Sequence, residues 1–191
     1  MTGINEVLHF WLSEVGESGW YVAAPEVDSA IKDRFMPTWQ AAWEGRLDGW
    51  AESAEGALAL LIVTDQFSRN MFRGDGRAFA TDAIARRVAR LAIARSFDLT
   101  VPEPQRVFFY MPFEHSEDPA DQDWSVALIE ARLPATGDGF AHHARLHREI
   151  IRRFGRFPFR NAALGRESTT EEAAFLSSGG YGALLREFAG T

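Results

Sequence analysis

The stretch Leu58-Ala59-Leu60-Leu61-Ile62-Val63-Thr64-Asp65-Gln66-Phe67-Ser68-Arg69-Asn70 decides the fold that we predict for this chain. Ser53 or Glu55 can begin a helix ahead of it, because serine caps helix N-termini and a carboxylate is favourable in the first turn. Within that helix, residues 58–63 are apolar on every side. A helix without a polar face is stable where other elements bury it. We therefore predict that this helix is central to the fold.

The same helix becomes polar directly after its apolar part. Three pairs of polar residues are spaced four apart there: Asp65 with Arg69, Gln66 with Asn70, and Arg69 with Arg73. Side chains at this spacing face one another along a helix. Either they form a local ion pair that anchors the next loop, or they contact a ligand. Buried charges need partners in both cases.

Helical spacing of apolar residues continues over nearly the whole chain, and no alternating strand is bounded by turn residues. The predicted helix starts are Asp28, Ser53 or Glu55, Thr81 or Asp82, Asp118 followed by Pro119, Asp138, the capping box over residues 168–171, and Tyr181. Pro37 is expected to bend or split the first of these helices. The fold class is therefore all-α, with about eight helices in antiparallel pairs stacked into an α-α array. One domain over residues 1–191 is the simplest organisation.

Composition excludes several classes of function. The chain has 191 residues and a net charge of −7, from 27 acidic and 20 basic residues, which argues against a generic nucleic-acid binder. It contains no cysteine, so disulfides and thiolate metal sites are excluded. No apolar run approaches the roughly 18 residues of a membrane span, so we expect a soluble cytoplasmic protein. Lys32 is the only lysine among the basic residues, and arginine suits carboxylate and phosphate ligands.

An acidic cluster follows the aromatic-rich part of the chain. The segment Glu114-His115-Ser116-Glu117-Asp118, with Asp121 and Asp123, holds five carboxylates within ten residues. They can bind a hard cation, or one of them can tune His115 as an acid or base. Helix capping already accounts for Asp118, and the spacing matches no calcium loop. We predict no metal here.

A second cluster contains three histidines over residues 142–147. His143 and His147 are four residues apart and can chelate zinc from one helix face, but no flanking HExxH pattern supports that interpretation. His147 lies on the apolar stripe of the predicted helix. A histidine there is more often a hydrogen-bonded core residue than a ligand.

The segment Phe154-Gly155-Arg156-Phe157-Pro158-Phe159-Arg160-Asn161-Ala162-Ala163-Leu164-Gly165-Arg166-Glu167 is too rich in glycine and proline to be one helix. Its three arginines can clamp a phosphate or a carboxylate. Alternatively, they hydrogen-bond the free carbonyl groups at helix ends and hold the helices together. The sequence leaves both interpretations open.

Four of these stretches together resemble a bacterial family known as domain of unknown function 924. They are Asp65-Gln66-Phe67-Ser68-Arg69-Asn70 with Arg73-Gly74, Arg77-Ala78-Phe79-Ala80-Thr81-Asp82, His115-Ser116-Glu117-Asp118, and Phe154-Gly155-Arg156-Phe157-Pro158 with Arg160-Asn161. The resemblance implies an all-helical fold similar to tetratricopeptide-repeat proteins, and no established activity.

Two positions depart from the family pattern. Ser68 stands where relatives often have proline, and Phe159 stands where they often have histidine, so a mechanism that needs an imidazole at position 159 is not expected here. His115 and His147 match the pattern, whereas His142 and His143 do not. This favours His147 alone over a zinc pair.

The first functional hypothesis is a pocket for a small anion, with hydrolase or transferase chemistry at a phosphorylated or carboxylated molecule. The predicted catalytic residues are His115 or His147 with Glu114, and the predicted anion-binding residues are Arg69, Arg73, Arg156, Arg160 and Asn161. The sequence identifies no cofactor and no oligomeric state.

The second hypothesis is a non-catalytic module that binds a peptide or a partner protein, since stacked helices form concave surfaces. Its aromatic anchors would come from Trp11, Trp20, Tyr21 and Trp43, although tryptophans are also common in cores. A third interpretation is that all of the charged clusters are structural and pair with one another inside the fold.

Overall fold

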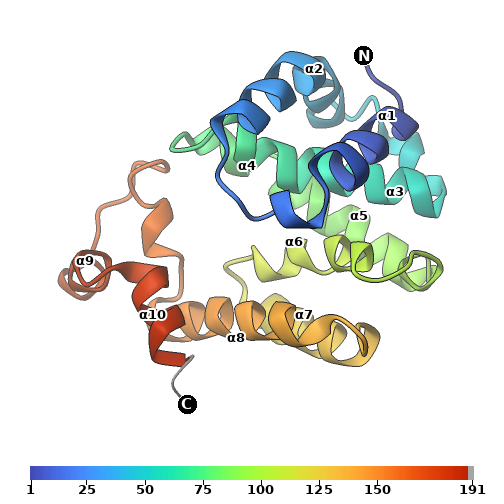
Figure 1. Ribbon diagram of the computed structural model, residues 1–191. Coiled ribbons are helices and arrows are strands. Elements are labelled where there is room, and N and C mark those ends of the chain that lie inside the picture. Colours follow the sequence, from blue (N-terminus) through green and yellow to red (C-terminus); the bar gives the residue numbers. More distant parts are fainter. Residues whose placement is uncertain (189–191) are drawn as a thin grey trace. The chain divides into compact units, whose positions relative to one another are not determined.

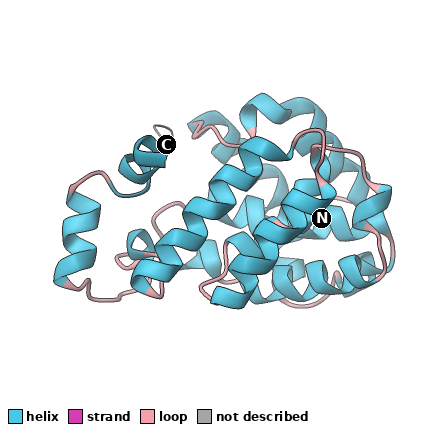
Figure 2. Ribbon diagram, turned by 90° about the horizontal axis from the view of Figure 1, so that it is seen from below, coloured by secondary structure: helices cyan, strands magenta, loops and turns pink. Residues whose placement is uncertain are grey.

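The computed structural model of the chain describes residues 1–188, which form helices joined by loops and turns and contain no strand (Figures 1 and 2). The predicted all-α class is confirmed. Of the helices in this range, none is long and apolar enough to cross a membrane. The chain divides into two compact units. Unit 1 comprises Met1–Arg73 and Arg77–Pro112, and unit 2 comprises Gly74–Gly76 and the residues from Phe113 onward. Each is described by itself.

Unit 1 is built from five α-helices joined by shorter helical turns. The helices are α1 (Ile4–His9), α2 (Pro25–Trp43), α3 (Ala54–Leu61), α4 (Ser68–Met71) and α5 (Asp82–Ala94). Two of the turns are π-helical, Phe10–Val15 and Ile62–Phe67. The short α6 (Met111–Glu114) spans the boundary between the two units.

The predicted central helix is present and buried. The Ser53 hydroxyl accepts a hydrogen bond from the backbone N–H of Gly56 at 3.1 Å and caps α3. Residues 58–63 are at most 3% exposed, as a helix without a polar face requires. The π-helical turn then leads into α4. There the hydroxyls of Thr64 and Ser68 donate to carbonyl groups one turn back, at 2.7 and 2.9 Å.

Helix α2 differs from its prediction at its first residue. It begins at Pro25, with Ala24 as the flanking residue, so the prediction that Asp28 caps it is wrong. Proline suits the first helical position because its fixed backbone angle is already helical. Pro37 lies inside α2 without ending it. Asp28 instead uses its carboxylate to bind Arg73 and the side-chain amide of Asn70.

Unit 2 contains four longer helices, α7 (Pro119–Arg132), α8 (Gly137–Phe154), α9 (Thr170–Ser177) and α10 (Gly180–Phe188). Helices α7 and α8 form an antiparallel pair. Arg145 of α8 contacts Glu130 at 3.1 Å, and Arg148, further along α8, contacts Asp123 near the start of α7 at 3.3 Å. Figure 1 shows the two helices side by side. The predicted antiparallel pairing is thus present here.

The helix starts of unit 2 follow from short-range chemistry. The Asp118 carboxylate accepts from the N–H of Ala120 at 2.9 Å, and Pro119 is the first residue of α7, as predicted. A capping box begins α9, with Thr169 and Glu172 as its members, one residue later than predicted. Helix α8 begins at Gly137, slightly before the predicted Asp138.

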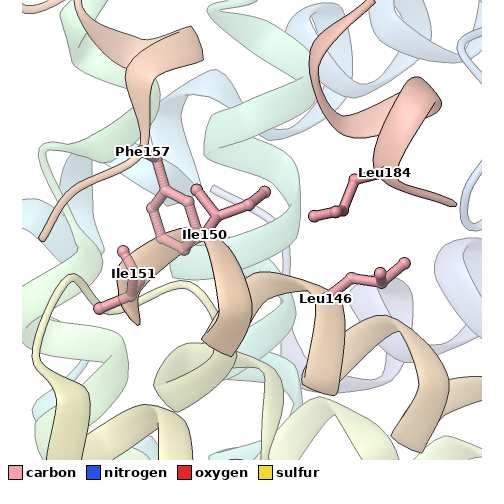
Figure 3. Packing of buried hydrophobic residues seen from close by; sticks show 5 residues of the cluster. All are labelled: Leu146, Ile150, Ile151, Phe157 and Leu184. Carbon is pink, nitrogen blue, oxygen red and sulfur yellow. The ribbon is translucent and has the colours of Figure 1, made fainter. Parts of the chain in front are cut away.

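Helix α10 is held against α8 by an apolar cluster (Figure 3). Leu184 of α10 packs with Leu146, Ile150, Ile151 and Phe157, which are all buried. Burying one leucine side chain contributes about 1.5–3 kcal/mol. This contact holds the first turn of α10, which carries Tyr181, close to α8.

Candidate functional site

The centre of the candidate site is a carboxylate–imidazole pair in unit 2. Glu114, at the end of α6, is 3% exposed, and its Oε1 lies 2.8 Å from Nδ1 of His147 on α8. The His147 side chain is 17% exposed. A carboxylate buried this deeply needs a partner that compensates its lost hydration, and the imidazole supplies one. Two of the three predicted catalytic residues are therefore in direct contact.

The contacts of His147 determine which nitrogen carries its proton. Nδ1 also lies 3.0 Å from the backbone carbonyl oxygen of His143, one turn earlier on α8. Both of its neighbours are acceptors, so Nδ1 is the donor. In the neutral ring the lone pair is then on Nε2, which forms no hydrogen bond with any of residues 1–188. This is the arrangement of a general base held in one tautomer by a carboxylate.

Other aromatic side chains of unit 2 surround His147. The ring of His115, the third predicted catalytic residue, has its centroid 6.1 Å from that of His147. Phe157 packs edge-on against His147 at 5.5 Å, and Tyr181 lies at 5.1 Å. The phenol oxygen of Tyr181 is 2.5 Å from Nδ1 of His143. Acid–base side chains from α6, α8 and α10 are thus gathered in one place.

The electrostatics of this group keep Glu114 ionised. Burial by itself raises the pKa of the Glu114 carboxyl, because a charge is poorly solvated inside the protein. The charge and the hydrogen bond of His147 outweigh this effect, with smaller contributions from His115 and His143. The net pKa of Glu114 is below its usual value. The carboxylate can therefore stabilise positive charge on His147.

The two histidines considered for zinc each have another partner. His143 directs Nδ1 to Tyr181, and His147 directs Nδ1 to Glu114. Across residues 1–188, no group of three or more histidine, aspartate or glutamate side chains is placed to hold a metal ion.

The arginine-rich segment beside this site is bound to carboxylates of unit 2. Arg166 holds Glu117 with two nitrogens, at 2.8 and 3.0 Å, and the backbone N–H of Phe157 donates to the same carboxylate at 2.8 Å. The pKa of Glu117 is lowered, since these donors outweigh the effect of burial. The Glu117 carboxylate thus joins the acidic segment after α6 to the loop that follows α8.

Arg156 and Asn161 also have protein partners. Arg156 binds the Glu172 carboxylate with two nitrogens, at 2.6 and 2.7 Å, and donates to the carbonyl of Glu167. Asn161 donates to Glu172 and to Ser168, and it accepts from Arg166. These bonds fit the interpretation in which this segment fastens the helices of unit 2 together.

Arg160, another predicted anion-binding residue, contacts the backbone of His115. Its guanidinium lies 4.3 Å from the centroid of the Phe157 ring, and its Nη2 donates to the backbone carbonyl of His115 at 3.0 Å. That carbonyl directly follows the C-terminus of α6, where helical carbonyls lack helical partners. Arg160 therefore brings a positive charge to the residues that contact His147.

Arg69 and Arg73 belong to unit 1. Arg69 contacts Asp65 at 3.1 Å and binds Asp82 with two nitrogens, at 2.9 and 3.1 Å. Arg73 binds Asp28. The predicted pairing of Asp65 with Arg69 is confirmed, and both arginines have carboxylate partners within unit 1.

Acidification is expected to weaken the attachment of α9. The Arg156 hydrogen bond, with donors from Thr169 and Asn161, lowers the pKa of Glu172 from 4.5 to about 2. A lowered carboxyl pKa means that the stabilisation is complete above pH 4.5 and is lost as the pH falls toward 2. Hydrogen exchange of α9, corrected for its intrinsic pH dependence, should accelerate over this range.

In Glu172→Gln that pH dependence should be absent, because the glutamine side chain does not titrate. The exposed neighbour Glu171→Gln is the matched control and should behave like the wild type. An identical acceleration in Glu172→Gln would contradict the assignment.

Sequence reasoning did not identify two members of these networks. Glu117 was noticed only as part of the acidic cluster, and nothing local indicates that Arg166, 49 residues away, binds it. Tyr181 was noticed only as a helix start. The apolar stripe of Tyr181, Leu184, Leu185 and Phe188, at helical spacing, is the signal that could have indicated a buried face there.

Comparisons with known proteins agree with one another. A family model described as bacterial protein of unknown function (DUF924) matches residues 7–180. The solved structure of a protein of unknown function from Agrobacterium tumefaciens is 43% identical and has a TM-score of 0.85, covering 91% of this chain and 96% of that one. A comparison with curated proteins finds no match.

Proposed function

We propose that this chain, which belongs to the bacterial DUF924 family of unknown function, is an enzyme that hydrolyses or transfers a group of a small anionic molecule, with His147 as general base. The 2.8 Å contact between Glu114 and Nδ1 of His147 carries the proposal. It fixes a tautomer whose free nitrogen can accept a proton, and a general base of this kind contributes about 10²–10⁴-fold to a rate.

The proposed step begins with a water molecule or a substrate hydroxyl beside Nε2 of His147. Nε2 takes the proton while the oxygen bonds to the phosphorus or the acyl carbon of the substrate. Glu114 stabilises the imidazolium that forms, since its carboxylate is buried and ionised. His115, whose ring lies 6.1 Å from that of His147, is the second candidate for proton transfer.

An anionic substrate is supported by a positive charge that is linked to this pair through Phe157. Arg160 stacks on Phe157, and Phe157 in turn contacts the His147 ring. We propose that this positive charge attracts the phosphate or carboxylate of the substrate. Arg156 and Asn161 are excluded from this role because their side-chain donors are already taken, those of Arg156 by Glu172 and those of Asn161 by Glu172 and Ser168.

The test uses two classes of anion. Inorganic phosphate and adipate are titrated while the melting temperature is recorded, and hydrolysis of p-nitrophenyl phosphate and mono-p-nitrophenyl adipate is followed by absorbance. We expect one class to raise the melting temperature and the ester of that class to be hydrolysed, because a ligand that binds the folded state stabilises it. Absence of both effects for both classes would contradict the proposal.

The alternative is a module that binds a peptide or protein through the four candidate aromatic anchors. Trp11 and Trp20 are buried in unit 1, whereas Tyr21 and Trp43 are exposed. Tyr21 precedes the 19-residue helix α2, and Trp43 is its last residue. Because α2 is about 28 Å long, the two exposed rings do not form one patch. The geometry therefore favours the enzyme. An α-α superhelix like that of tetratricopeptide-repeat proteins, and a cytoplasmic location, remain parts of the proposal.

A further inference from the structure

Tyr181 is an acid–base side chain near His147 that has no role in the step proposed above. It lies in the first turn of α10, and its ring centroid is 5.1 Å from that of His147. Its phenol oxygen contacts Nδ1 of His143 at 2.5 Å, and the two rings are stacked within 13° of parallel. His143 and His147 lie on consecutive turns of α8. Tyr181 therefore bridges both.

The hydrogen bond between Tyr181 and His143 has a preferred direction. A phenol O–H is a stronger donor than a neutral imidazole N–H, and an imidazole nitrogen is the stronger acceptor. Burial, and then the negative charge of Glu114, raise the pKa of Tyr181, so the phenol keeps its proton at neutral pH. His143 is exposed, yet desolvation of its ring lowers its pKa, so that the ring is a neutral acceptor. Tyr181 is thus a proton donor beside a proton acceptor.

We propose that Tyr181 is the general acid of this site and donates its phenol proton to the leaving oxygen of the substrate while His147 deprotonates the attacking water. This inference rests on the function proposed above. His143 is a positioning residue: it holds the phenol in place between turnovers.

The proposed step balances as a hydrolysis. The water oxygen bonds to phosphorus or to the acyl carbon, and one water proton passes to Nε2 of His147. The bond to the leaving oxygen breaks, its electron pair stays on that oxygen, and the Tyr181 proton passes to it. The imidazolium proton of His147 then returns through solvent to the tyrosinate. One water is consumed, and both side chains regain their starting forms.

The fold supports this role because α10 is fastened independently of the chemistry. Leu184 anchors the helix in the cluster drawn in Figure 3, three residues after Tyr181 and thus on the same helical face. Gly179 and Gly180 before it have φ values of 105° and 54°, which other residues rarely adopt. The sharp turn between α9 and α10 that they allow directs Tyr181 toward α8.

The test compares leaving groups that differ in their need for a proton. p-Nitrophenyl phosphate and mono-p-nitrophenyl adipate release a phenolate that is stable without protonation, whereas methyl phosphate and monomethyl adipate release an oxygen that needs a proton. Tyr181→Phe should lower turnover of the methyl ester by about 10²–10⁴-fold and leave the p-nitrophenyl ester within a few-fold of the wild type. His147→Gln should lower both.

Three outcomes separate the two proposals. Equal effects of Tyr181→Phe on both leaving groups, or no effect on either, would overturn the general acid while leaving His147 as base. Loss of neither activity in His147→Gln, or no hydrolysis of any probe by the wild type, would overturn the proposed function and this inference with it. The pattern expected above supports both.

A second measurement needs no substrate. In ¹⁵N-histidine NMR spectra of the intact chain, Tyr181→Phe should shift the Nδ1 resonance of His143 and retain the Nδ1–H signal of His147, which depends on Glu114. An unchanged His143 resonance would show that the hydrogen bond is absent and would overturn the inference.

Discussion

Replacement of Arg69 by methionine is expected to lower the free energy of unfolding of unit 1 by about 3–5 kcal/mol. Burial lowers the pKa of the Arg69 guanidinium, but the charges of Asp65 and Asp82 outweigh it and the net pKa is raised. Asp65 is 2% exposed and Asp82 only 13%. Methionine fills the volume but leaves two carboxylates close together in a poorly solvated place, without their shared cation.

Urea unfolding followed by tryptophan fluorescence measures this effect, because five of the six tryptophans lie in unit 1. Arg73→Met is the matched control. It removes an arginine four residues further on, whose side chain is 47% exposed beside Asp28, so that a loss of at most about 1 kcal/mol is expected. Adding Asp65→Asn to Arg69→Met should recover part of the stability, since one buried charge is removed. Equal losses for Arg69→Met and Arg73→Met would contradict this assignment.

Replacement of His147 by glutamine is expected to lower kcat by about 10²–10⁴-fold for whichever p-nitrophenyl ester the wild type hydrolyses. Glutamine keeps a polar group beside Glu114 but cannot accept the proton of water at neutral pH. The melting-temperature shift with phosphate or adipate should persist, because the proposed anion contacts do not include His147. The variant would thus distinguish a loss of proton transfer from a loss of anion binding.

Two further variants make this prediction specific. Glu114→Gln should also lower kcat, because a neutral amide no longer stabilises the imidazolium of His147. His142→Gln is the control on the same helix, since His142 forms no hydrogen bond with any of residues 1–188, and it should retain wild-type turnover. Full activity of His147→Gln, or equal losses in His142→Gln and His147→Gln, would contradict the role of His147 as base.

The local features of this protein were predictable to within one to three residues. The starts of α3, α7 and α9 follow from Ser53, Asp118 and Thr169, whose side chains bond to backbone groups two or three residues ahead. The prediction that Asp28 starts α2 is wrong because Pro25, three residues earlier, can begin a helix equally well. Where two residues can each start a helix, the tertiary contacts of their side chains decide between them.

The candidate site was predictable in part. The sequence predicts Glu114, His115 and His147 as catalytic residues, and these three lie close together in unit 2. The partners of the arginines were not predictable, because they are distant in sequence. Arg73 binds Asp28 from 45 residues away, and Arg156 binds Glu172 from 16. Arg73 and Arg156 are therefore bound to carboxylates of the same chain.

The sequence by itself determined the helical class, the burial of residues 58–63 and most helix starts, because these depend on the 3.6-residue period and on hydrogen bonds between near neighbours. Only the tertiary structure decided which carboxylate pairs with which basic side chain. A guanidinium or an imidazole can satisfy many carboxylates equally well, and the packing of helices selects one of them. For this reason Glu114 belongs to His147, and Tyr181, unremarkable in the sequence, lies beside them.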